Sequence, residues 1–248
     1  MRLPACAPCG IRFLRKVRAV PGRFNGFFPE TLEFFQDIRF HNDKMWFDAH
    51  RDDFEAYVKT PLEALCMDLE PMMAQLDPSL DTRPRRVVSR IYRDARYARG
   101  VPYRDHMWLS YKPMGKSNSE AFTYYFYIQE DAWGVGVGFY DRVPELQERF
   151  RYRLFTEGEL WRSLLRTPQM APFTLEADGP KRPKPVELPD DLAPWYHYRR
   201  FTFDASYPIG PEVFTPGLKE QVARQFRALE PVYRFVQGWD VDMPGGSK

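Results

Sequence analysis

The first third of the chain repeats apolar residues every three or four positions, which is the spacing of amphipathic helices. One helix is predicted to open at Pro29, a second to be capped by Asn42 or Asp43, and a third to begin at Pro61. Pro71 is expected to kink or split the third helix, because proline lacks an N–H group. The apolar positions of these helices are Leu32, Phe35 and Ile38; Phe47, Phe54 and Val58; and Leu62, Leu65, Leu69, Met72, Met73 and Leu76.

The pattern then changes to alternating apolar and polar residues, which is typical of strands. Two runs separated by four residues, Phe122–Ile128 and Trp133–Tyr140, are predicted to form a β-hairpin. Glycines occupy every second position of the latter run, at 134, 136 and 138, which differs from the turn into a helix that a dinucleotide-binding loop needs. We expect aromatic rings of the partner strand to cover this bare face, the alternative being close approach of a ligand to the backbone. The remaining predicted strands are Val87–Tyr92, His106–Lys112 and Tyr198–Phe203.

Helical spacing returns in the last hundred residues. Pro144–Leu154 and Gly158–Leu165 are predicted helices, whereas Pro168–Pro194 contains seven prolines and is predicted to be mostly extended loop. A long final helix is predicted from a cap at Thr215 to Val236. This order of elements predicts an α+β fold, in which N-terminal helices and a long C-terminal helix pack on a central antiparallel sheet.

Charge is unevenly distributed along the 248 residues. The chain has 36 Lys and Arg against 34 Asp and Glu, but residues 1–29 hold six of the basic residues and no acid. The remainder therefore carries a net charge of −4. A protein that coats nucleic acid normally has a basic face over its whole domain, so nucleic acid is not favoured as a partner.

The same composition suggests how the chain is organised. Residues 24–240 are predicted to form a single α+β domain, since 44% apolar and 16% aromatic residues are enough for a substantial core. We interpret residues 1–23 as a basic, disordered extension, with a targeting signal or a functional basic arm as the alternatives. Residues 241–248 are expected to form a flexible tail.

Cysteine and histidine usage limits the chemistry. Cys6 and Cys9 have no second Cys or His pair at zinc-finger spacing, and Cys66 falls in a helical pattern as a small core residue. The four histidines are far apart in sequence, so no metal site is predicted, and no cofactor motif is recognised. This cysteine usage suits a reducing cytoplasm. No stretch approaches the roughly 18 apolar residues of a membrane span, so no membrane contact is expected.

The segment from Arg83 to Arg104 contains eight arginines, three tyrosines and one acid. A turn at Gly100 is expected to fold the end of the segment back onto its start, which would gather guanidinium groups and phenol hydroxyls. Because arginine binds phosphates and carboxylates in bidentate fashion, we predict a small anionic ligand here. Loop architecture and a solvated surface are the alternatives. The predicted ligand-binding residues are Arg90, Arg93, Asp94, Arg96, Tyr103 and Arg104.

The sequence leaves open whether the protein is an enzyme. Asp94, Tyr103 and His106 are weak catalytic candidates. Neighbouring arginines should lower the pKa of Asp94, which would make it a poor base near neutral pH. The sequence contains neither the G-x-S-x-G motif of hydrolases nor a Cys/His nucleophile pattern.

Three blocks of sequence resemble the DUF2461 family. They are Phe24-Asn25-Gly26-Phe27 with Pro29-Glu30-Thr31-Leu32 and Phe35; Asn42 with Trp46-Phe47 and His50-Arg51; and Arg90-Ile91-Tyr92-Arg93-Asp94-x-Arg96-Tyr97 followed by Pro102-Tyr103. The hairpin with its glycine strand and the Arg227-Ala228-Leu229-x-Pro231 end are also similar. The resemblance implies a bacterial domain spanning about residues 24–237 and no particular reaction or catalytic residues. A lysine precedes the Pro-Tyr pair in the family pattern, where this chain has Gly100-Val101.

Two hypotheses of function follow. In the first, the protein binds a small anionic ligand at the Arg/Tyr/Asp cluster, with or without chemistry. In the second, it is a non-enzymatic interaction module whose aromatic and arginine side chains dock a protein or a single-stranded nucleic acid. The oligomeric state stays open.

Overall fold

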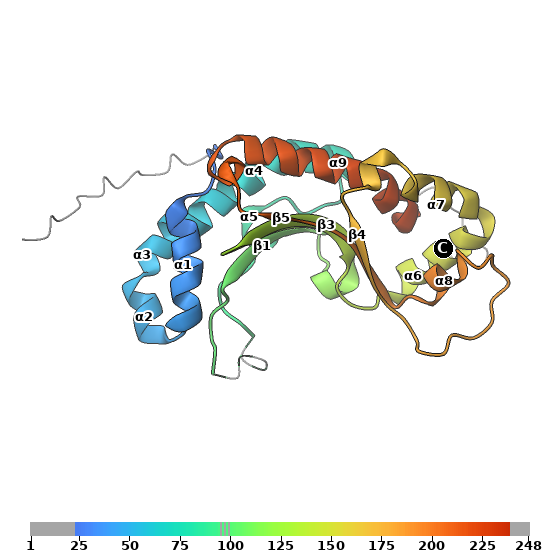
Figure 1. Cartoon of the computed structure of the whole chain (residues 1–248), viewed down its shortest axis with the longest axis horizontal. Helices are drawn as coiled ribbons and strands as arrows, with labels where there is room; N and C mark the ends of the chain where they lie inside the picture. Colours follow the sequence, from blue (N-terminus) through green and yellow to red (C-terminus); the bar gives the residue numbers. More distant parts are fainter. Residues whose placement is uncertain (1–22, 95, 97, 99, 239–248) are drawn as a thin grey trace, which may run out of the picture.

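The computed structural model describes residues 23–94, 96, 98 and 100–238, so the predicted extension lies outside these residues except for Arg23, and the predicted tail lies outside them entirely. At its centre is one antiparallel sheet of five strands in the order β1-β2-β3-β5-β4. The strands are β1 (His106–Tyr111), β2 (Phe122–Gln129), β3 (Ala132–Phe139), β4 (Thr174–Asp178) and β5 (Arg200–Pro208). Helices α4 (Thr60–Leu76) and α9 (Gly217–Gln237) lie over one face of this sheet (Figure 1), so the predicted α+β fold is confirmed.

The N-terminal helices stand at one end of the sheet (Figure 1). The helix α1 (Pro29–Phe40) begins where predicted, and α2 (Lys44–Ala49) is capped by Asp43, whose carboxylate accepts a hydrogen bond from the Trp46 N–H at 2.9 Å. The helix α3 (Arg51–Asp53) continues through a π-helical segment, η1 (Phe54–Lys59), directly into α4. The predicted helix boundary at Pro61 is therefore only a change of helical pitch.

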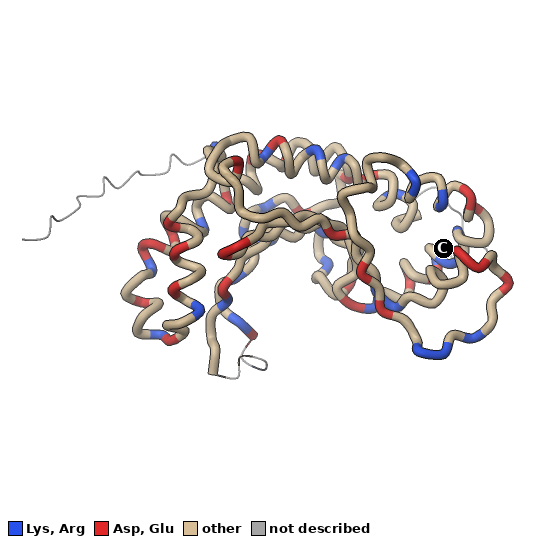
Figure 2. Tube along the Cα trace, in the orientation of Figure 1, with Lys and Arg blue, Asp and Glu red and all other residues tan. Residues whose placement is uncertain are grey.

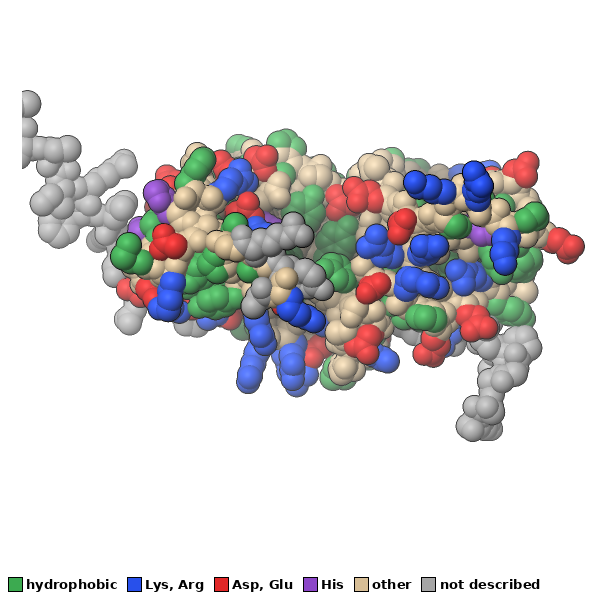
Figure 3. Space-filling model, turned by 90° about the horizontal axis from the view of Figure 1, so that it is seen from below, with side chains coloured by type: hydrophobic (Ala, Val, Ile, Leu, Met, Phe, Trp, Pro, Cys, Tyr) green, Lys and Arg blue, Asp and Glu red, His purple; other side chains and the backbone are tan. Residues whose placement is uncertain are grey.

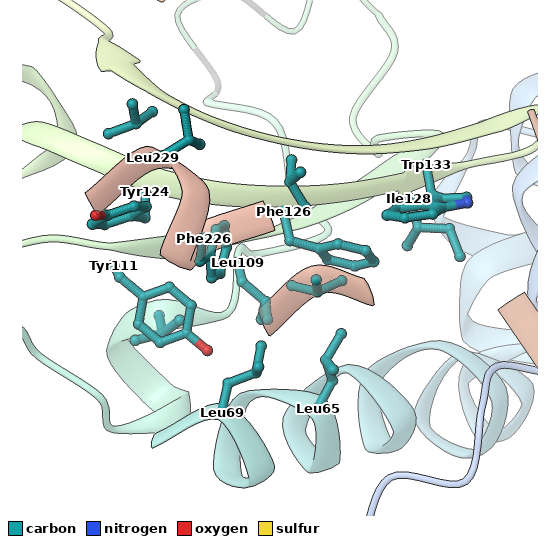
Figure 4. Close-up of a cluster of buried hydrophobic side chains, with 14 of the residues drawn as sticks. Leu65, Leu69, Leu109, Tyr111, Tyr124, Phe126, Ile128, Trp133, Phe226 and Leu229 are labelled. Atoms are coloured by element: carbon teal, nitrogen blue, oxygen red, sulfur yellow. The ribbon is translucent and has the colours of Figure 1, made fainter. Parts of the chain in front are cut away.

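The apolar face of the sheet packs against α4 and α9. Leu65 and Leu69 of α4 and Phe226 of α9 meet the strand residues there, and the Tyr124 and Phe226 rings lie 5.3 Å apart between centroids (Figure 4). Pro71 lies inside a continuous α4, so it does not split the helix. All five residues of the predicted apolar stripe of α9 are buried: Leu218, Val222, Phe226, Leu229 and Val232. Gly238 ends α9 in the left-handed conformation, as is common after helices.

One predicted strand was wrong. Val87–Tyr92 is not a strand: α5 (Pro84–Val87) is a short helix, and the residues after it form only isolated bridges, such as Val88 with Leu109. The proline-rich stretch 168–194 is mostly loop, as predicted, but it also contains β4, which pairs with β5 at the edge of the sheet, and the first two residues of α8 (Ala193–His197). The strand β4 has no clear apolar alternation, because only one of its side chains, that of Leu175, is partly buried.

The other end of the molecule carries α6 (Pro144–Thr156) and α7 (Gly158–Leu165), both as predicted, next to α8 (Figure 1). Three short 3₁₀ segments lie in connections of the chain: Asn118–Glu120 between β1 and β2, Pro168–Met170 between α7 and β4, and Pro211–Phe214 between β5 and α9. Cys66, predicted to be a small core residue, is buried in α4, and burial raises the pKa of its thiol to about 12. No helix among the described residues is long and apolar enough to cross a membrane.

One face of the central strand β3 carries apolar side chains, and the other face carries glycines. Its apolar side chains, such as Val135 and Val137, are buried, whereas Gly134, Gly136 and Gly138 alternate on the opposite side. A Cβ atom at Gly134 would lie 2.5 Å from the Tyr127 ring, so this ring lies directly across β3. The prediction that aromatic rings of the hairpin partner cover the glycines is confirmed for Gly134 and Gly136, which lie under Tyr127 and Tyr125, whereas a Cβ atom at Gly138 would meet Thr202 of β5.

We expect Gly136→Ala to destabilise the protein by about 1–3 kcal/mol, the usual cost of overpacking. The new methyl group would overlap both the Tyr125 hydroxyl and the Phe203 carbonyl oxygen, one of which belongs to rigid backbone. Urea unfolding measures the change. Gly179→Ala is the matched control, because its Cβ would meet Tyr198 at an ordinary 3.4 Å, and it should be neutral or slightly stabilising. Equal stability of the two variants would contradict the packing argument.

Candidate functional site

The arginine-rich segment forms a hairpin below β1, which we call the arginine hairpin (residues 90–104). Tyr92 and Tyr103 form a bridge, Arg93 N–H donates to the Pro102 carbonyl at 2.8 Å, and Arg104 N–H donates to the Ile91 carbonyl at 2.8 Å. Gly100 has a φ of +85°, which favours glycine at the turn. The predicted fold-back of the segment is therefore confirmed.

A single asparagine fixes the hairpin to the N-terminal helices. The Asn42 side-chain oxygen accepts from the Tyr103 N–H at 2.8 Å, and its amide nitrogen donates to the carbonyls of Tyr103 at 3.1 Å and Ile38 at 2.9 Å. The Tyr103 ring is buried and stacks on Phe47 with 4.3 Å between centroids. Burial raises the pKa of Tyr103, and the charges of Tyr92 and Asp48 add to this. Its ring thus serves to anchor the hairpin on α2.

A carboxylate just after the hairpin joins three cationic or polar side chains. Asp105 accepts from Arg39 Nε at 3.2 Å and from Arg93 Nη2 at 3.4 Å, and it contacts His106 Nδ1 at 3.0 Å. Burial acts to raise the pKa of Asp105, but the hydrogen bond to His106, a backbone hydrogen bond and that of Arg39 outweigh it, so the pKa is lowered. Asp105 was not predicted as a site residue, because it lies one residue beyond the arginine-rich stretch.

The other predicted ligand-binding residues do not share one centre. Asp94 and Arg96 form an exposed ion pair with 2.6 Å between Oδ2 and Nη2, and hydrogen bonds from Arg96 hold the pKa of Asp94 at about 2. The Arg90 side chain is exposed, while Arg93 is taken up by Asp105 and by the Tyr103 carbonyl at 2.9 Å. The structure therefore brings Arg93 and Arg104 close together beside the carbonyl oxygens of Tyr103 and Arg90, while the Arg90 side chain is exposed and Asp94 and Arg96 pair with each other.

Arg104 differs from these arginines, because it forms no ion pair with a described carboxylate. Its Nη1 donates to the carbonyl oxygens of Arg90, at 2.8 Å, and Tyr92, and its guanidinium lies over the Trp108 ring at 4.9 Å from the centroid. Burial lowers the pKa of Arg104, and the positive charge of Arg93 lowers it further. The charge of Asp94 acts in the opposite direction but only in part, and a half-buried guanidinium that forms no ion pair with a described carboxylate is a place where an anion would be stabilised.

Trp108, whose ring lies under the Arg104 guanidinium, belongs to the face of the sheet opposite α4 and α9. Trp108 on β1 pairs in register with Tyr127 on β2, and the Tyr125 and Tyr127 rings lie 6.4 Å apart. Tyr125 donates to Asp204 Oδ1 on β5 at 2.8 Å, and Tyr127 to Oδ2 at 3.5 Å. We call Trp108, Tyr125, Tyr127 and Asp204 the open-face cluster; all four are half-buried.

The glycines of β3 make the cluster possible, because the two tyrosine side chains must cross that strand to reach Asp204 on β5. Burial raises the pKa of Asp204, while the tyrosine hydrogen bonds oppose this. Figure 3 looks onto this face and shows a hollow at its middle, between the two ends of the molecule. The bare glycine face was predicted from the sequence, whereas Asp204 was not, because it is 79 residues from Tyr125.

Among the three weak catalytic candidates, His106 has the placement most suited to proton transfer. It follows Arg104 by two residues, contacts Asp105, and its ring lies 5.6 Å from that of Trp108. Asp94 is exposed and strongly acidic, and Tyr103 is packed against α2. Within residues 23–94, 96, 98 and 100–238, no three His, Cys, Asp or Glu side chains come together to hold a metal ion.

Comparison with known proteins places this fold with its arginine hairpin in a sequence family. Residues 30–235 match the family described as conserved hypothetical protein (DUF2461), and the chain belongs to it. None of the curated proteins matches the sequence. A crystal structure of an uncharacterized protein from Methanothermobacter thermautotrophicus is 12% identical, with a TM-score of 0.30; 67% of this chain and 95% of that chain are covered. A likeness at that TM-score carries no argument about this chain.

We expect Asp105→Asn to lower the free energy of unfolding at pH 7 by about 1–3 kcal/mol, because charge-assisted hydrogen bonds to Arg39 and Arg93 are lost. The pKa of Asp105 is lowered on folding, so its stabilisation is complete above the unfolded carboxyl pKa of about 4 and is lost as the pH falls through the lower folded value. The difference between wild type and variant should therefore shrink below about pH 4 in urea unfolding curves.

Asp94→Asn is the control for this measurement, since that carboxylate lies in an exposed ion pair that solvent screens. It should leave the unfolding free energy at pH 7 nearly unchanged. A loss as large as that of Asp105→Asn would mean that the exposed half of the hairpin, and not its base, fixes the segment.

Proposed function

We propose that the protein binds a small anionic ligand, bearing a phosphate or carboxylate, at the base of the arginine hairpin where it meets the open-face cluster. Arg104 supplies the main charge, with Arg93 beside it. His106 and Trp108 border the same place. The observation that carries the proposal is the half-buried guanidinium of Arg104, which forms no ion pair with a described carboxylate, is repelled by Arg93, and is compensated only in part by the charge of Asp94.

An anion at this place would improve the electrostatics in two ways. It would neutralise a guanidinium that burial penalises, and it would screen two like charges from each other. The Arg104 guanidinium is already oriented by two carbonyl oxygens and the Trp108 ring, so little side-chain freedom would be lost on binding. Such preorganisation is typical of binding sites and exceeds what a solvated surface arginine needs.

The open-face cluster supports a ligand that is larger than the anionic group alone. Its tyrosine rings lie flat across β3 and are half-exposed, and the Asp204 carboxylate can accept further hydrogen bonds. Each ionised carboxylate oxygen accepts more than one hydrogen bond, so N–H or O–H donors of a ligand fit here. We therefore propose an anion attached to a body with donor groups, in a cytoplasmic protein whose described cysteine is a buried free thiol.

Exposed apolar side chains favour a second candidate, an interaction module that docks a protein or a single-stranded nucleic acid. Phe40 is 74% and Met45 83% exposed beside the α1–α2 turn, and Tyr92 of the hairpin is 47% exposed. Steep weakening of binding with salt would favour a nucleic-acid strand, whereas an anion held at Arg104 would depend on salt less. The net negative charge of the chain beyond residue 29 argues against the strand.

We expect Arg104→Gln to weaken binding of the best anion at least tenfold, because one charge-assisted hydrogen bond contributes about 1.5–3 kcal/mol. A thermal-shift screen with inorganic phosphate, sulfate, phosphorylated metabolites and short carboxylates would find that anion. A ligand at a hundred times its dissociation constant adds about 2.7 kcal/mol of stability. Isothermal titration then gives the dissociation constant for wild type and variant.

Arg85→Gln removes the same charge from an exposed position on α5 and serves as the matched control. It should bind the anion as the wild type does. Equal loss in both variants would indicate general electrostatic attraction, and equal binding by wild type and Arg104→Gln would contradict the proposed site. If no anion stabilises the wild type, the interaction module becomes the better explanation.

A further inference from the structure

A second candidate site is lined by residues of α6 and α8, and these helices lie at the end of the molecule away from the arginine hairpin (Figure 1). It is a pocket of about 520 Å³, within the roughly 300–1,000 Å³ of small-molecule sites. Successive turns of one face of α6 supply most of its wall, since the positions are spaced by one, three or four residues. The lining residues are Arg142, Pro144, Gln147, Glu148, Arg151, Tyr152, Phe155 and Tyr196.

The charged groups of the pocket are of both signs and are not paired with each other or with any other described charged side chain. Arg151 is held in place: its Nε donates to the Tyr196 carbonyl at 2.8 Å, and its guanidinium lies 5.3 Å from the centre of the Tyr196 ring. Its two terminal nitrogens are left for other acceptors. Arg142 is exposed at the mouth, and Glu148 supplies a carboxylate on the same helix face.

An unpaired acceptor adds to this. The Gln147 amide nitrogen donates to the Arg199 carbonyl, while its oxygen Oε1 is buried and accepts no hydrogen bond from the described residues. Buried polar atoms are nearly always hydrogen-bonded, so this oxygen is an unmet acceptor next to the pocket, but it is shielded from solvent, and the Gln147 side chain would have to turn for a ligand to reach it. The Glu148 carboxylate lines the same pocket as the Arg142 and Arg151 guanidinium groups.

The rest of the wall is aromatic. Phe155 is 51% exposed and meets the Tyr196 ring edge to face, with 5.9 Å between centroids. Tyr152 lies one residue after Arg151 and is half-buried. An exposed phenylalanine next to unpaired charges costs solvation unless an apolar group covers it, so the pocket suits a ligand with an apolar part.

We propose that this pocket binds a small zwitterion with an apolar side chain, the chemistry of a free aromatic or large aliphatic amino acid. Arg142 and Arg151 take the carboxylate, Glu148 takes the ammonium group, and Tyr152, Phe155 and Tyr196 contact the side chain. The ligand is neutral overall, which distinguishes this site from the anion site at Arg104, and the inference stands independently of that proposal.

Isothermal titration of the full chain with L-phenylalanine tests the inference, with two matched ligands. 3-Phenylpropanoate lacks the ammonium group and phenethylamine lacks the carboxylate, so each should bind at least tenfold more weakly than phenylalanine. Glycine lacks the ring and should bind more weakly still. Absence of phenylalanine binding up to millimolar concentration, or binding of 3-phenylpropanoate as tight as that of phenylalanine, would overturn the assignment.

Variants separate the roles of the two charges. Glu148→Gln should weaken phenylalanine at least tenfold and leave 3-phenylpropanoate unchanged, because the latter has no ammonium group. Arg142→Gln should weaken both ligands. The Arg142 side chain has no hydrogen bond or ion pair with another described residue, so it is a safer substitution than Arg151, which binds the Tyr196 carbonyl.

Two controls complete the experiment. Arg224→Gln changes an exposed arginine on α9 and should leave phenylalanine binding unchanged. Arg104→Gln should do the same, so failure of the anion site and failure of this pocket are distinguishable. A loss of phenylalanine binding in Arg104→Gln equal to that in Arg142→Gln would place the amino acid at the hairpin and refute the pocket.

Discussion

The alternation of large and absent side chains on β3 is the constraint on which the rest of the structure depends. On one side, Val135 and Val137 complete the apolar layer beneath α9. On the other, the glycines leave a trough one strand wide, and Tyr125 and Tyr127 cross it to meet Asp204. Any side chain larger than hydrogen would lift these rings from the sheet. The same strand thus sets the thickness of the core and the depth of the opposite surface.

Several of the arginines that dominate the sequence pattern are bound by carboxylates of the fold. Arg83 binds Asp81, Arg93 binds Asp105 and Arg96 binds Asp94, whereas Arg104 is half-buried and forms no ion pair with a described carboxylate. Positive charge is also spread to the opposite end of the molecule, where the loop after β4 carries Lys181, Arg182 and Lys184 (Figure 2). A count of arginines therefore locates a charged region, whereas the identity of the functional charge depends on which carboxylates the fold brings near.

The elements that could be predicted are those whose signal is local. Helical spacing identified α1, α4, α6, α7 and α9, and alternation identified β1, β2 and β3. In each of these elements the regular spacing of buried residues can be recognised within one short segment of sequence. The arginine hairpin was also foreseen from its own turn. The strand β4 was missed because it is bound by backbone hydrogen bonds to β5 with little burial of its side chains. Asp204 and Asn42 were missed as site residues because their partners are 61 to 79 residues away.

The exposed outer edge of β4 has a consequence for association between molecules. The opposite edge of the sheet, at β1, is covered by Val88 and Ser89, whereas β4 pairs only with β5 among the described strands. Unpaired backbone groups at a sheet edge can pair with the same edge of another copy and begin aggregation. Glu176 and Asp178 are exposed on this strand. Asp178 pairs with Arg200 of β5, with 3.3 Å between Oδ2 and Nη2, whereas Glu176 forms no ion pair with a described residue. Two such edges meeting would bring the Glu176 carboxylates together, so like-charge repulsion protects the edge at neutral pH, and protonation in acid would remove that protection.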